Sequence, residues 1–117
     1  MASPFRNADI VRVAEFFEGS RHAAYAFARD IWLREAVATL TRLRAAAESG
    51  DDLHFLCDHL REGARVVGAW RYLHIADAIV QTSSSGRADR VLAAIDEGLR
   101  HADRVSRWLD VRCRQAA

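Results

Sequence analysis

The chain has 117 residues, half of them hydrophobic, which is enough for a single domain with a buried core. Its 17 basic and 16 acidic residues leave a net charge of +1, and this balance argues against a nucleic-acid-binding surface. No segment reaches the roughly 18–20 apolar residues of a membrane span, and the N-terminus lacks the apolar stretch of a signal peptide. We therefore expect a cytoplasmic protein with no membrane insertion.

The first half of the chain predicts a short helix followed by a long one. Residues 1–6 are expected to be a loose leader, and the apolar face of the first helix then consists of Ile10, Val13, Ala14 and Phe17. Ser20 can cap the second helix, which is expected to extend from residue 21 to about residue 48. Its inward line consists of Ala26, Leu33, Val37, Leu40, Leu43 and Ala47. Phe27 and Ile31 lie on another face, which the short first helix is expected to cover.

Three more helices are expected in the second half. Gly50 suits the end of the long helix, and Asp51 or Asp52 can cap the next one, whose apolar stripe is Leu53, Leu56, Leu60, Ala64 and Val67. A helix from residue 70 to about 82 and a last one over residues 87–114 follow, separated by a turn at 83–86. Because the connections are short, we expect an all-α fold, an antiparallel up-down four-helix bundle with a short N-terminal covering helix, forming one domain over residues 1–117.

His59 is expected on the shoulder of its helix, about a quarter turn from the centre of the buried stripe. The same shoulder carries Phe55 one turn earlier, Gly63 one turn later and Val66 beyond it. Because Gly63 has no side chain, another surface can come close to the imidazole. On this spacing alone, the simpler interpretation is a half-exposed histidine without a role, next to a helix–helix contact at Gly63.

The helix around His59 resembles a known family. His59, Gly63, Ala64, Gly68 and Ala69 match histidine-containing phosphotransfer (HPt) domains of bacterial two-component systems, in which His-x-x-Lys-Gly-Ser/Ala precedes a Gly-Ala or Gly-Leu pair. The flanking helices also fall where such a bundle has them, so the resemblance extends over residues 8–115. One position departs from the pattern: the family's lysine, three residues after the histidine, is Glu62 here.

The resemblance implies a phosphorelay intermediate, in which His59 carries a phosphoryl group between receiver-domain aspartates. The partner-docking face would consist of Phe55, Glu62, Gly63 and Val66. The implied partners are a response-regulator receiver domain and a hybrid sensor kinase, of which this chain could be the tail domain. The receiver would bring the magnesium ion, so no cofactor is expected in this chain. A kinase activity is not expected, because the sequence has no glycine-rich phosphate loop.

Two other functions stay open. Glu62 would repel an incoming phosphoryl group, and Arg61 and Arg65 are expected on the far shoulder, so the chain could instead be a non-catalytic adaptor that binds a receiver or an enzyme through the same face. The third is a helical dimerisation module, although a monomer is the expectation. Cys57 and Cys113 are expected to be free thiols, and the five histidines do not have the spacing of a metal site.

Overall fold

The chain is all-helical in the computed structural model, which describes residues 1–115. No strand occurs within those residues. The helices are α1 (Asn7–Glu15), α2 (Arg21–Phe27), the π-helical turn η1 (Ala28–Leu33), α3 (Arg34–Ser49), α4 (His54–Val67), α5 (Trp70–Ser84) and α6 (Ala88–Gln115). The expected helices are all present, with bounds within a few residues of those expected from the sequence.

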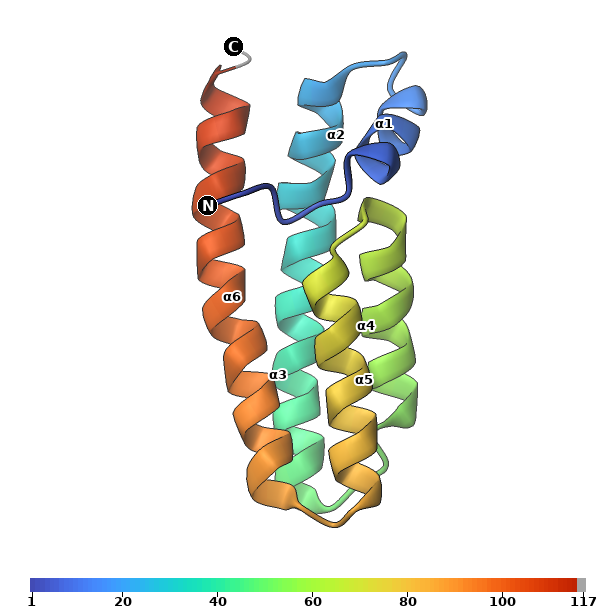
Figure 1. Cartoon of the computed structure of the whole chain (residues 1–117), viewed down its shortest axis with the longest axis vertical. Coiled ribbons are helices and arrows are strands. Elements are labelled where there is room, and N and C mark those ends of the chain that lie inside the picture. The colour runs from blue at the N-terminus through green and yellow to red at the C-terminus, as the bar shows by residue number, and fades with distance from the viewer. Residues whose placement is uncertain (116–117) are drawn as a thin grey trace.

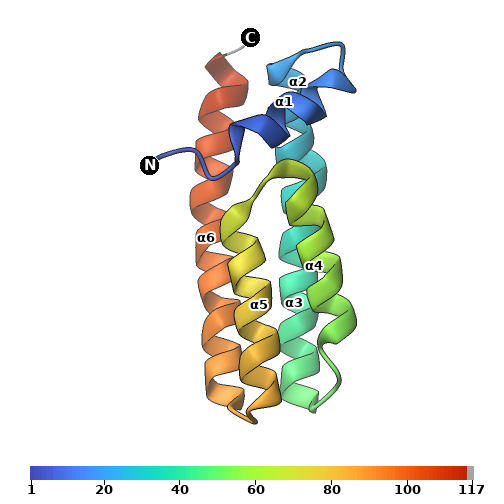
Figure 2. The same ribbon diagram turned by 45° about the vertical axis from the view of Figure 1, so that its right-hand side comes forward.

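Helices α3 to α6 lie side by side along the long axis of the molecule, and successive helices run in opposite directions (Figures 1 and 2). Helix α3 contacts α4 and α6, and α5 contacts the same two helices, so the four enclose a common core. Helix α1 lies at one end, where it contacts α2 and α4. Helix α1 buries Ile10, Val13 and Ala14, and Phe17 lies 6.0 Å from Phe27 between ring centroids. The expectation that the first helix also covers Ile31 is wrong, because Ile31 is 59% exposed and α1 contacts α2 and α4 instead.

Helices α2, η1 and α3 form one continuous helix, on which one line of buried residues repeats at a spacing of four, with Leu33, Thr39 and Leu43 buried beside it. The line consists of Ala24, Ala28, Trp32, Ala36 and Leu40. An α-helix has about 3.6 residues per turn and would rotate such a line out of the core, whereas the wider π-helical turn keeps it facing inward. The predicted inward line is confirmed at Leu33, Leu40 and Leu43, which are buried, and Val37 and Ala47 pack against the core while half-buried. Ala26 is also half-buried.

The segment before α1 packs against the helices, in contrast to the loose leader expected for residues 1–6. Phe5 is 4% exposed, and its ring packs edge-on against Trp32 and Trp108 at centroid distances of 5.5 and 5.9 Å. The backbone N–H of Arg6 donates to the carbonyl of Gly68 at 2.9 Å. Residues 4–6 thus attach α1 to the connection between α4 and α5.

Most of the helix ends follow from the local sequence. The Ser20 hydroxyl accepts a hydrogen bond from the Ala23 N–H at 3.1 Å, as its capping role predicted. Gly50 ends α3 in the left-handed conformation, with φ at 75°. The Asp52 carboxylate accepts from the His54 N–H at 3.0 Å, at the start of α4. Helix α1 begins after Arg6 without a side-chain cap.

Replacing Gly68 with alanine is expected to destabilise the junction between α1 and α4. Gly68 has φ at 71°, and a Cβ atom there would lie 2.6 Å from Asp9 Oδ2. The left-handed conformation costs a residue with a Cβ atom about 1–2 kcal/mol, and displacing Asp9 adds to this loss. Gly50→Ala is a matched control, because Gly50 has φ at 75° but nothing within 4 Å of the added atom. Urea unfolding should give a larger loss for Gly68→Ala; equal losses would contradict the contact with Asp9.

Candidate functional site

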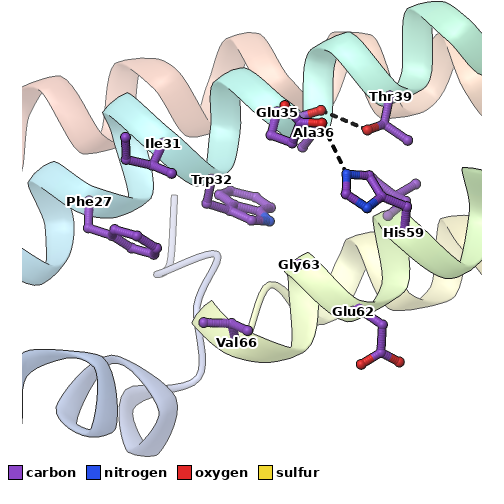
Figure 3. A pocket seen from close by; sticks show the side chains of 11 residues that line it. Phe27, Ile31, Trp32, Glu35, Ala36, Thr39, His59, Glu62, Gly63 and Val66 are labelled. Carbon is purple, nitrogen blue, oxygen red and sulfur yellow. Dashed lines mark hydrogen bonds and ion pairs between the residues drawn. The ribbon is translucent and has the colours of Figure 1, made fainter. Parts of the chain in front are cut away.

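His59 lies on α4 and its imidazole points toward α3 (Figure 3). The side chain is 48% exposed, and Nε2 lies 3.0 Å from Oε1 of Glu35 on α3. The neighbouring Cys57 and Leu60 are buried, which puts His59 on the shoulder between the core and solvent. This is the position predicted from the helical period.

Two of the three other predicted shoulder residues are also exposed. Phe55 is 80% exposed and Val66 is 53% exposed. Each is large and apolar, and fully burying such a side chain is favourable by about 1.5–3 kcal/mol. The side of α4 that carries His59 therefore offers apolar area to another surface.

A pocket of about 350 Å³ lies between α4 and the η1–α3 segment, with His59 at one end (Figure 3). Its walls are largely apolar and consist of Phe27, Ile31, Trp32, Ala36, Thr39, Leu60, Gly63 and Val66, with the acids Glu35 and Glu62 at its rim. Ile31, which belongs to the π-helical turn, is 59% exposed. Three of the four predicted docking residues, Glu62, Gly63 and Val66, thus line the pocket, whereas Phe55 lies outside it.

Gly63 faces the chain's own Trp32. A Cβ atom at position 63 would lie 3.4 Å from Trp32 Cδ1 and 3.6 Å from Nε1, which is ordinary contact. Gly63 is half-buried as a result. The missing side chain therefore serves a helix–helix contact as well as leaving the pocket open.

Glu62 points away from both the imidazole and the pocket interior (Figure 3). Its carboxylate accepts a hydrogen bond from Arg65 Nη1 at 2.8 Å, which offsets its charge. Arg61 is bound to Asp58 and Asp77, at 3.0 and 2.6 Å. Arg61 and Arg65 thus each form ion pairs with nearby carboxylates of the chain.

The acid closest to His59 is Glu35, which the sequence analysis did not single out. Its backbone carbonyl accepts from the Thr39 hydroxyl at 2.8 Å, and its Oε1 lies 3.7 Å from Nη1 of Arg42. Glu35 and His59 are 24 positions apart. The spacing of residues in the sequence does not predict a contact between two different helices. The π-helical turn just before Glu35 also changes the rotation of the helix, so an α-helical period does not predict the direction in which Glu35 points.

The two cysteines do not line this pocket. Cys57 is a buried free thiol, and burial raises its pKa to about 11, so it is a poor nucleophile. Cys113 is also free and buried. Among residues 1–115, no three histidine, cysteine or acidic side chains are grouped closely enough to hold a metal ion. No helix in the same range has the length and apolar character needed to cross a membrane.

Comparison with known proteins identifies no relative: no protein-family model, curated protein or solved structure matches the chain.

Proposed function

We propose that this chain is an HPt-type four-helix bundle with a covering N-terminal helix, and that His59 carries a phosphoryl group between receiver-domain aspartates. The observation that carries the proposal is a half-exposed imidazole at the edge of an apolar pocket, on a helix whose shoulder also presents Phe55 and Val66 to solvent. Exposed apolar area of this kind is typical of protein interaction sites. The reaction itself, phosphoryl transfer to a histidine, is indicated by the sequence match at His59, Gly63, Ala64, Gly68 and Ala69.

In the proposed reaction the lone pair of a neutral ring nitrogen attacks the phosphorus of a receiver's aspartyl phosphate. A nitrogen–phosphorus bond forms, and the oxygen–phosphorus bond breaks with its electron pair staying on the aspartate. The reverse reaction passes the group to a second receiver. Receiver domains supply the magnesium ion that neutralises the phosphoryl oxygens, so His59 needs only to be positioned and accessible.

The pocket supports docking of a receiver beside the ring. Its apolar wall extends from Trp32 to Val66, and Phe55 continues the apolar surface on the other side of His59. Burying these side chains would exclude water from the reacting atoms, where electrostatic interactions with the phosphoryl group become stronger. Glu62 stands at the rim with its charge paired to Arg65, so it does not block this approach.

Phosphoryl transfer from labelled receiver domains tests the proposal, with His59→Gln as the key variant. We expect an acid-labile label on the wild type and none on the variant, because the amide is not a nucleophile. His54→Gln is the control, since His54 lies on the same helix with its ring bound to Asp52 at 2.8 Å. Equal label on His59→Gln and the wild type would contradict the proposal.

One observation favours the non-catalytic adaptor as a second candidate. Nε2 of His59 is engaged by the Glu35 carboxylate at 3.0 Å, and an adaptor needs no free ring nitrogen. The same labelling experiment separates the two functions. A receiver that binds the chain tightly without labelling it, and whose binding is lost when Phe55 is replaced by serine, would establish the adaptor.

A further inference from the structure

The contact between Glu35 and His59 has a consequence for the proposed phosphoryl transfer, on which this inference rests. A carboxylate only accepts hydrogen bonds, so the 3.0 Å contact from Oε1 to Nε2 requires a proton on Nε2. With that proton in place, Nε2 has no free lone pair. The conformation in the structure therefore holds His59 in a form that cannot attack phosphorus through Nε2.

Glu35 also occupies the space in front of Nε2. A phosphoryl group bonded to this nitrogen would place its oxygens where Oε1 now lies, and both groups are negatively charged. Glu35 is 52% exposed and His59 is 48% exposed, so water screens part of this repulsion. The carboxylate must nevertheless leave before Nε2 accepts a phosphoryl group.

Arg42 can bind a phosphoryl group in place of the Glu35 carboxylate. Its Nη1 lies 3.7 Å from the same Oε1 that contacts Nε2, so the guanidinium is held close to the imidazole by Glu35. Arg42 is 60% exposed, and its long side chain can follow a phosphoryl oxygen as readily as a carboxylate. This cation comes from α3, whereas the lysine of the resembled motif would lie on α4 at the position of Glu62.

We propose that Glu35 is a positioning residue that gates His59, and that Arg42 transfers from Glu35 to the phosphoryl group when the gate opens. In the closed state the proton stays on Nε2, and the N–H group donates a hydrogen bond to the Glu35 carboxylate. Opening moves the carboxylate away, the Nε2 proton goes to water, and Nδ1 takes up a proton from water, which leaves a lone pair on Nε2. That lone pair forms the bond to phosphorus, and the leaving aspartate keeps the electron pair of the broken bond.

Glu35→Gln tests the gate. The amide is neutral and can either donate or accept, so it no longer fixes a proton on Nε2, and it does not repel an incoming phosphoryl group. We expect label to accumulate about tenfold faster than in the wild type, equivalent to about 1.4 kcal/mol. Glu48→Gln is the matched control, because Glu48 lies on the same helix with 61% exposure and an arginine at 3.7 Å. It should keep the wild-type rate, and Arg42→Gln should slow labelling about fivefold.

Nitrogen NMR of the His59 ring provides a second readout that does not depend on phosphoryl transfer. We expect a proton on Nε2 in the wild type and in Glu48→Gln, and a shift toward the Nδ1-protonated form in Glu35→Gln. Labelled wild type with an unchanged or slower rate in Glu35→Gln would overturn the gate and leave the proposed function standing. Label on Nδ1 would overturn it too. Absence of label from the wild type and all variants would instead contradict the proposed function itself.

Discussion

Lowering the pH from 6.5 to 4 is expected to reduce the free energy of unfolding by about 3 kcal/mol through a single residue, His101. His101 lies on α6 and is 4% exposed, and neither of its ring nitrogens has a hydrogen-bond partner within the described residues. Burial lowers its pKa to about 4, with further lowering by the nearby Arg71 and Arg104 and a smaller opposing effect from Glu97. An unfolded histidine has a pKa near 6.5.

The loss of stability at low pH follows because His101 takes up a proton when the chain unfolds. Well above pH 6.5, His101 is neutral in both states and contributes no pH dependence. Between pH 6.5 and about 4, the unfolded chain holds a proton on this residue and the folded chain does not, so stability falls by about 1.4 kcal/mol for each unit of pH. Below the folded pKa both states are protonated and the loss is complete.

Urea unfolding at pH 7 and pH 4.5 checks this expectation. His101→Leu replaces the imidazole with an apolar side chain of similar size in the core beside Tyr72, whose ring centroid lies 5.3 Å from that of His101. This variant should lose much less stability on acidification than the wild type. His22→Leu is the control, because His22 is exposed on α2 and its replacement should leave the pH dependence unchanged. Identical pH dependence in His101→Leu and the wild type would rule out His101 as the cause.

His101 also illustrates what the helical period can and cannot identify. The apolar residues of α6 that repeat at helical spacing include Ala102 but not its neighbour His101, so the sequence alone does not place His101 in the core. The wide buried face of α6 includes both, since it meets α3 on one side and α5 on the other. A polar residue adjacent to an apolar stripe carries no signal of its own burial.

The candidate site was likewise only partly predictable from the sequence. The stripe of α4 repeats regularly from Leu53 to Val67, so the exposed shoulder with Phe55, His59 and Val66 follows from the sequence. Glu35 does not, because its contact with His59 joins two helices. The π-helical turn at Ala28–Leu33 is equally invisible to an α-helical period. Local periodicity therefore predicts one wall of the pocket, and only the packing of α3 against α4 supplies the other.

Gly63→Arg is expected to lower the rate of the proposed phosphoryl transfer to His59 at least 100-fold while the fold is retained. The first added atom meets Trp32 Cδ1 at 3.4 Å, which is ordinary contact, and the rest of the side chain would extend across the pocket between His59 and Val66. A charged chain there removes the apolar space that a receiver would enter and places bulk beside the ring. Since Gly63 is at the edge of the core, the free energy of unfolding should change by no more than about 1 kcal/mol.

Gly63→Ala separates docking from packing. A methyl group fits against Trp32 and favours the helical state by about 1 kcal/mol, so this variant should be at least as stable as the wild type and should accept label at a similar rate. Thermal unfolding and labelling of both variants then distinguish a loss of docking from a loss of stability. A folded Gly63→Arg that is labelled at the wild-type rate would show that receivers do not approach over position 63. If Gly63→Arg unfolds, and Gly63→Ala is also destabilised, Gly63 is required for the contact with Trp32, and its place in the proposed docking face is wrong.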